Sequence, residues 1–115
     1  MSPLLLMMAV LAAQAGAAPA YRAHMTGAQL VRDMLADPFQ GDNSMKRQRA
    51  MGYIEGVADA SAGGRWCPAG KLVPHELPYV VVEEMEKAGQ LEGDASALVI
   101  AALGRLFPCR AGGAR

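Results

Sequence analysis

The 115-residue chain has few of the residues that build catalytic and metal sites. It contains only two histidines, His24 and His75, and only two cysteines, Cys67 and Cys109. Neither histidine lies in a nucleophile motif, and no C-x2-C or H-x3-H pair is present to bind zinc. A thiol site of Cys67 and His75 would require a reduced Cys67. With no glycine-rich phosphate loop either, we expect no enzyme, no metal site and no cofactor.

Neither sign of charge is in excess. Eleven Lys and Arg residues balance eleven Asp and Glu residues, and no basic run or basic patch interleaved with aromatic residues occurs. A protein that binds nucleic acid needs cations to neutralise phosphates. We therefore expect no nucleic-acid partner.

The first 20 residues carry no charged side chain. An apolar run over residues 3–13 is followed by small residues that form possible signal-peptidase sites at Ala17 and Ala20. We predict a signal peptide over residues 1–20, cleaved at one of these sites, although the usual basic residue near the start is missing. The alternative is an uncleaved membrane anchor, but the run is shorter than the ~20 residues that a spanning helix needs. After cleavage we expect no membrane association.

A single domain over residues 21–109 would then remain, with residues 110–115 as a frayed tail. Such a domain is small enough that burial of its core alone gives marginal stability. Two cysteines in an exported chain most simply form one disulfide, between Cys67 and Cys109. The bridge would join the ends of two helices.

The apolar periodicity and the turn residues predict four helices. Thr26 and Gln29 form a capping box for the first, which stops at Asp37-Pro38. The second begins near Met45 and ends near Ala62, before two glycines. The others run from Pro74 to Gly89, with a wide start or kink expected at Pro78, and from Ala95, capped by Asp94, to Phe107. The fold class predicted is all-α, a small four-helix bundle stapled by one disulfide.

Two of these helices raise further questions. The last one is apolar over more than half its circumference, which fits either a central helix or a dimer-forming one. Residues 80–82, Val-Val-Val, would alone suit a strand, but the helical period continues past them.

The second predicted helix carries four residues to which we assign structural roles. Tyr53 belongs to an apolar stripe that faces the core. Gly52 and Gly56 lie one turn apart and suggest that another backbone packs closely there, the alternative being simple tolerance of glycine. Asp59 lies where the helix dipole disfavours an anion. It should be compensated by Arg65, Lys71 or free backbone N–H groups.

Five residues are candidates for binding a partner. Arg65, Trp66 and Lys71 lie in a loop that the disulfide would anchor, and Arg and Trp often dominate interface energies. Trp66 could instead fold over the disulfide and cover it. Lys46 and Arg49 lie, with Arg47, in the first turns of the second helix, where the dipole disfavours cations. They indicate either an acidic partner or a solvated face.

The segments MTGAQLV, GYIEGVADA, WCP, LPYVVVEEMEK and ALVIAALGRLFPC together resemble the Rap/Tai family of periplasmic immunity proteins. The resemblance implies a small helical, disulfide-stapled and often dimeric protein of the periplasm. It also implies that the chain binds and blocks a peptidoglycan amidase delivered by type VI secretion, without catalysis of its own. Family members often carry a second cysteine pair. Residues around Met34 and Ala50 occupy those places here.

A periplasmic stress protein or acid-activated holdase, similar to the HdeA type, is the alternative function. Such a chaperone opens at low pH, and the eleven carboxylates of this chain could drive opening by losing their charge. Circular dichroism and dye binding at acid pH would separate the two functions, because the holdase must unfold and expose apolar surface.

Overall fold

The computed structural model describes residues 21, 23–68 and 74–110. This part of the chain forms four α-helices and one 3-10 turn and contains no β-strand, so the predicted all-α class is confirmed. The predicted signal peptide lies outside the described residues, as does all of the predicted tail except Arg110. The elements are α2 (Gly27–Leu35), α3 (Asn43–Ser61), η1 (Pro74–Glu76), α4 (Leu77–Ala88) and α5 (Ala95–Leu106).

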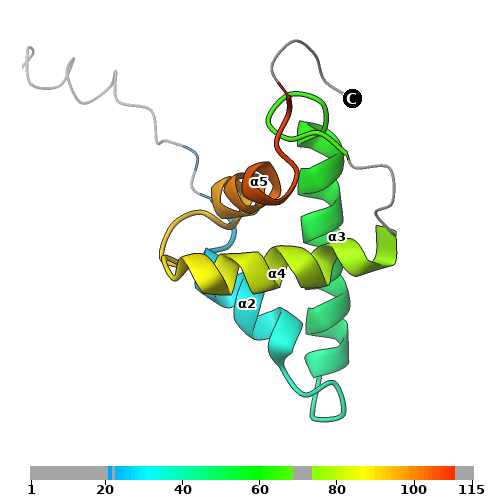
Figure 1. Cartoon of the computed structure of the whole chain (residues 1–115). Helices are drawn as coiled ribbons and strands as arrows, with labels where there is room; N and C mark the ends of the chain where they lie inside the picture. The colour runs from blue at the N-terminus through cyan, green and yellow to red at the C-terminus, as the bar shows by residue number, and fades with distance from the viewer. Residues whose placement is uncertain (1–20, 22, 69–73, 111–115) are drawn as a thin grey trace, which may run out of the picture.

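The four helices pack around one another, and every pair of them is in contact. In Figure 1, α4 crosses in front of the middle of the long α3, while α2 converges with α3 at the lower end of the view. Like each of the other helices, α5 packs against the remaining three, which fits the central place expected for it and leaves the dimer-forming alternative untested. None of the helices that the structure describes is long and apolar enough to span a membrane.

One hydrophobic cluster forms the core between these helices. Each helix contributes residues three or four apart, which places them on one stripe of its surface. Tyr53 is half-buried and packs against this core, as its place in the apolar stripe of α3 predicts. The largest fully buried side chains come from all four helices: Leu30, Met34, Ile54, Pro78, Val81, Met85, Val99 and Leu103.

The start of α2 is fixed both locally and by the loop that joins α4 to α5. The Thr26 hydroxyl accepts a hydrogen bond from the Gln29 N–H, and the Gln29 side chain accepts one from the Thr26 N–H, which confirms the capping box. The N–H groups of Gly27 and Ala28 donate to carbonyls of that loop, at 3.0 and 2.8 Å. The free N–H groups that begin a helix are thereby satisfied.

Helix α4 ends at the expected residue but starts later than predicted. Pro74 opens the 3-10 turn η1 and the α-helix begins at Leu77, so the region before Pro78 is wound more tightly than an α-helix and the predicted wide start is wrong. Gly89 ends the helix in the left-handed conformation, with φ of 78°, and its N–H donates to the carbonyl of Met85. Asp94 occupies the N-cap position of α5, but its side chain makes no capping hydrogen bond.

The prediction that a backbone packs against Gly52 and Gly56 is wrong. Both glycines are exposed, and a Cβ atom added at either one would meet nothing within 4 Å. The close approach is at Gly27 instead, where a Cβ would lie 2.5 Å from Cδ1 of Leu98 and 3.0 Å from the carbonyl oxygen of Leu91. Glycine is therefore required at the first position of α2 and only tolerated in α3.

This difference predicts that alanine substitutions at the two places change the free energy of unfolding in opposite directions. Gly52→Ala and Gly56→Ala should each raise the free energy of unfolding by about 0.5–1 kcal/mol, because alanine restricts the unfolded chain and clashes with nothing. The matched control is Gly27→Ala, which should lower it by about 1–3 kcal/mol through overpacking against α5. Urea unfolding followed by circular dichroism measures all three variants. A loss of stability at Gly52 or Gly56 would contradict the open space seen there.

Candidate partner-binding surfaces

The segment after α3 turns back sharply onto the helix. Ala62 caps α3, and Gly63 has a φ of 87°, a conformation that glycine adopts without strain. The N–H of Gly63 donates to the carbonyl of Trp66 at 2.7 Å, and the N–H of Arg65 donates to the carbonyl of Ser61 at 3.3 Å. This turn therefore ends α3 where the two glycines predict.

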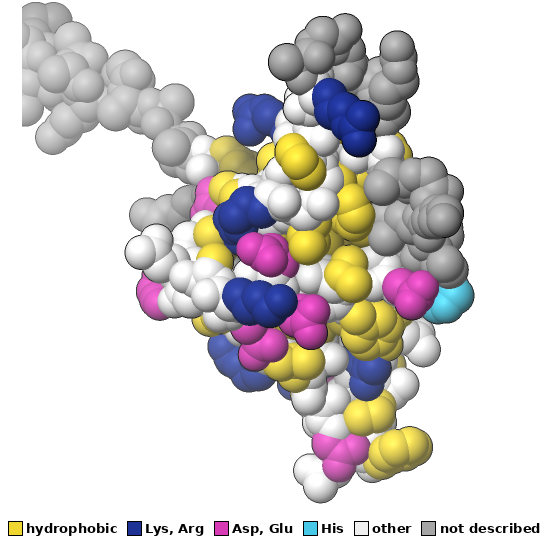
Figure 2. Space-filling model, in the orientation of Figure 1, with side chains coloured by type: hydrophobic (Ala, Val, Ile, Leu, Met, Phe, Trp, Pro, Cys, Tyr) yellow, Lys and Arg dark blue, Asp and Glu magenta, His cyan; other side chains and the backbone are white. Residues whose placement is uncertain are grey.

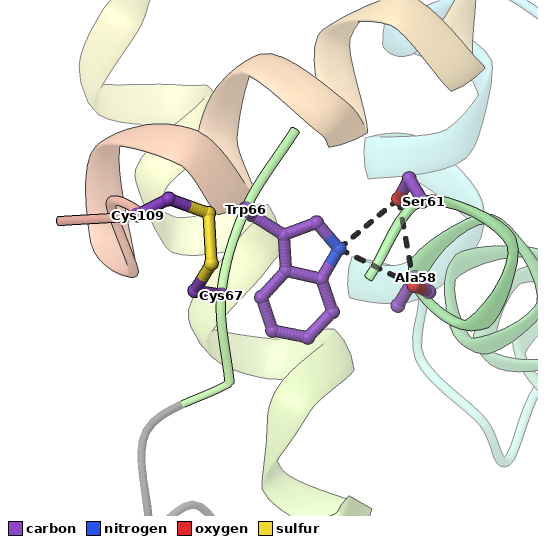
Figure 3. The surroundings of a disulfide bond; sticks show 5 residues. All are labelled: Ala58, Ser61, Trp66, Cys67 and Cys109. Atoms are coloured by element: carbon purple, nitrogen blue, oxygen red, sulfur yellow. Dashed lines mark hydrogen bonds between the residues drawn. A yellow bond between two sulfur atoms is a disulfide. The ribbon is translucent and has the colours of Figure 1, made fainter. Parts of the chain in front are cut away.

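The predicted disulfide joins Cys67 to Cys109, 42 residues apart in the sequence (Figure 3). Beside it, the N–H of Cys67 donates to the carbonyl of Phe107 at 2.9 Å. A covalent bond and a backbone hydrogen bond thus hold the segment after α3 to the end of α5. Both cysteines of the chain are used, so neither is a free thiol.

Trp66 is buried, with 4% of its surface exposed. Its indole N–H lies 3.2 Å from the carbonyl oxygen of Ala58 and 3.0 Å from the hydroxyl of Ser61, both at the end of α3. Its ring packs on Phe107 of the segment after α5, with centroids 5.8 Å apart. In Figure 3 the ring points toward α3 and the Cys67 side chain points the other way, toward Cys109. Trp66 therefore belongs to the core and offers no exposed anchor to a partner.

Arg65 is exposed on the same segment. The backbone there runs close over α5, because a Cβ at Gly104 would lie 3.4 Å from the Arg65 carbonyl oxygen. Arg65 is thus a cation presented on a well-fixed backbone, as a partner-binding residue should be. Lys71, the third candidate in this loop, lies outside the described residues.

Contacts within the chain account for two of the three cations at the start of α3. The Lys46 ammonium lies 3.5 Å from Asp42, in an exposed ion pair. The Arg47 guanidinium donates to the Tyr79 hydroxyl at 2.6 Å and lies 5.3 Å from the centre of the same ring. Arg49 is exposed and forms no ion pair among the described residues. Arg49 therefore remains the stronger candidate for meeting an acidic group.

Asp59 is exposed near the end of α3. Within the described ranges it has no ion pair and no side-chain hydrogen bond, so neither Arg65 nor a loop N–H compensates it. Lys71 lies outside those ranges. A solvated carboxylate is enough to explain what the structure shows of Asp59.

Phe39, which no motif described above includes, is 93% exposed in the turn between α2 and α3. The signal was present: an aromatic residue follows Asp-Pro in a turn, where the chain gives it no helical stripe to join. No sequence pattern marks Tyr79 as the partner of Arg47 either. Tyr79 shares the exposed face of α4 with Glu83 and Glu86.

The described residues offer little to catalysis or to metal binding. They contain no group of three or more His, Cys, Asp or Glu side chains that could hold a metal ion. The cleft beside His24 and Asp94 is shallow, about 390 Å³, and is also lined by Tyr21, Met25 and Gln29. Neither His24 nor Asp94 forms an ion pair there. The features that stand out are two surfaces. One is the segment of residues 62–67, which the disulfide ties to the end of α5 and which we call the stapled segment. The other is the turn between α2 and α3.

The comparison with protein families agrees with a binding role. The model of the Rap1a immunity proteins matches residues 9–109, which includes all four helices and both cysteines. No individual curated protein matches the chain. The match covers most of the sequence, and the chain belongs to the family of Rap1a immunity proteins.

Proposed function

We propose that this protein neutralises a peptidoglycan amidase effector of type VI secretion by binding it and blocking its active site. The membership in an immunity family is the observation that carries the proposal, since an immunity protein acts by binding a cognate effector. The mechanism is steric exclusion of the substrate, with no chemical step by the immunity protein. Electrostatic complementarity would set the choice of partner and the rate of association.

Two surfaces suit this contact. One is the stapled segment, where Arg65 is exposed and the buried Trp66 supports the backbone from below. Lys71, four residues after Cys67 in the sequence, is proposed to add a second cation to this surface. The other is the cationic start of α3, with Lys46 and Arg49. A surface held in one conformation before binding loses less entropy when the complex forms. The disulfide supplies that rigidity for the first surface.

The proposal also includes export to the periplasm and the formation of a homodimer. A disulfide persists in an oxidising compartment, which fits a periplasmic protein whose leader is removed after Ala17 or Ala20. The periplasm is also where an enzyme that cuts peptidoglycan would act. A homodimer is proposed from the family resemblance alone.

The structure gives the holdase alternative no specific support. No polar or charged side chain among the described residues is buried, so this part of the chain holds no buried carboxylate that acid could neutralise. Its cross-helix ion pair, Glu84 with Arg105 at 2.7 Å, is partly exposed. Breaking such a pair costs at most about 1 kcal/mol.

An inhibition assay tests the proposed function. The mature chain, titrated into a candidate amidase effector sought among the genes adjacent to its own, should abolish hydrolysis of purified peptidoglycan at about equimolar amounts. An amidase from an unrelated effector is the control and should keep its activity, because specificity depends on matched surfaces. Calorimetry gives the affinity in parallel. Binding without inhibition would refute active-site blocking, and no binding to the adjacent amidase would refute the choice of partner.

A further inference from the structure

The turn between α2 and α3 gathers exposed apolar side chains. Three of the five large hydrophobic residues exposed in the described chain lie within eleven positions of one another: Leu35 at 56%, Phe39 at 93% and Met45 at 66%. We call these three residues the apolar tip. Figure 1 shows the turn at the lower end of the molecule, and Figure 2 shows hydrophobic side chains reaching that end. Exposed apolar groups that cluster mark interaction sites more often than isolated ones do.

The turn is held by its own hydrogen bonds. The side-chain carboxylate of Asp37 accepts a hydrogen bond from the N–H of Phe39 at 3.0 Å. The backbone carbonyl of Asp37 accepts one from the side-chain amide of Asn43 at 2.9 Å. Gly41 has a φ of 55°, which lets the chain reverse. The Phe39 ring is therefore presented by a backbone of fixed shape, so that docking it costs little ordering entropy.

The apolar tip lies outside the core. None of the first seven residues of α3, 43–49, is buried, and the first buried residue of that helix is Ala50. The hairpin of α2 and α3 thus extends beyond the packed part of the molecule. Since Phe39 buries almost nothing, its hydrophobicity adds little to folding.

We propose that the apolar tip inserts Phe39 into an apolar pocket of the partner protein, next to a carboxylate that pairs with Arg49. This inference rests on the proposed function, that the chain binds a protein effector, and it names the contact. Leu35 and Met45 would pack on the rim of the pocket. Arg49 lies one helical turn beyond Met45, also exposed, so that one partner surface reaches both.

Shape and charge favour a protein pocket over the other occupants of an apolar surface. A convex knob fits a concave socket, and membership in an immunity family implies that the partner is a protein effector. Asp37 and Asp42 flank Phe39 and Lys46, Arg47 and Arg49 follow, so the charges around the tip are mixed and form no cluster of cations large enough to bind anionic lipid. A socket with an apolar floor and charged rim meets both the ring and its charged neighbours.

Truncation of Phe39 tests the inference. Phe39→Ala should raise the Kd for the adjacent amidase by about 30-fold or more, as expected for an aromatic anchor at an interface. Circular dichroism and the thermal midpoint should stay at the wild-type values, because the ring is exposed. The matched control is Tyr21→Ala, which removes an aromatic side chain that is 89% exposed far from the turn and should leave the Kd unchanged. Arg49→Gln should weaken binding less and reduce its dependence on salt.

The outcomes are distinct for the two proposals. If the wild-type chain binds and Phe39→Ala binds equally well, the role of the apolar tip is overturned and the proposed function stands. If the wild-type chain does not bind the amidase, both are overturned. Two further assays use wild type and Phe39→Glu: sedimentation velocity over a range of concentrations, and co-sedimentation with vesicles of anionic lipid. If Phe39→Glu alters self-association or vesicle binding but leaves the affinity for the amidase unchanged, the apolar tip binds a second copy or a membrane and the inference is refuted.

Discussion

Reducing the Cys67–Cys109 disulfide should lower the thermal midpoint of this protein by about 15 °C or more. The bridge closes a 42-residue separation, and restricting an unfolded loop of that length stabilises the folded state by ~4 kcal/mol in the chain-entropy model. In a domain of fewer than 100 residues, each kcal/mol shifts the midpoint by about 4–8 °C. Differential scanning calorimetry with and without reductant measures the effect.

The double variant Cys67→Ser, Cys109→Ser provides the control. Its midpoint should match that of the reduced wild type and should not respond to reductant, which separates loss of the bridge from other effects of the reagent. Affinity for the effector should fall as well if Arg65 is part of the contact, because the segment that carries Arg65 loses its covalent tie. An unchanged midpoint on reduction, or two free thiols in the purified protein by mass spectrometry, would contradict this account.

Truncating Trp66 to alanine should lower the free energy of unfolding by about 3–5 kcal/mol. The substitution empties a buried site, removes the contact with Phe107 and ends two hydrogen bonds to the end of α3. That loss is a large fraction of the 5–15 kcal/mol that keeps a typical domain folded. Urea unfolding followed by circular dichroism is the measurement, because the only tryptophan is lost from the variant.

A second variant separates packing from binding. Trp66→Phe keeps an aromatic ring beside Phe107 but lacks the indole N–H, so it should cost less, about 1–2 kcal/mol. Its affinity for the effector should equal that of wild type when both are folded. A folded Trp66→Phe protein with a strongly weakened affinity would show that Trp66 contacts the partner despite its burial. Wild-type affinity in this variant would confine Trp66 to a structural role.

Local chemistry made part of this fold predictable. The capping box at Thr26 and the glycine at position 89 act within one helical turn, so their residues alone indicate where helices begin and end. The disulfide was predictable for a different reason, since two cysteines allow one pairing. The positions of Lys46 and Arg49 at the exposed start of α3 also follow from the helical period.

Long-range packing determined what the sequence left open. Gly27 is approached closely by the Leu91 carbonyl oxygen and by the side chain of Leu98, 71 residues away, whereas the sequence pointed to Gly52 and Gly56. Arg47 meets Tyr79 because α4 crosses α3, an arrangement that no local pattern encodes.

The residues of the candidate site also separate into those that local sequence predicts and those that long-range packing places. Four helices, one disulfide and a few exposed cations follow from the amino-acid sequence alone, because periodicity, caps and composition are local properties of the chain. The burial of Trp66 and the exposure of Phe39 depend on how the helices pack. Both residues are aromatic and both lie in turns, so neither their hydrophobicity nor their local position in the chain distinguishes them. The crossing of distant helices leaves space for one ring in the core and none for the other.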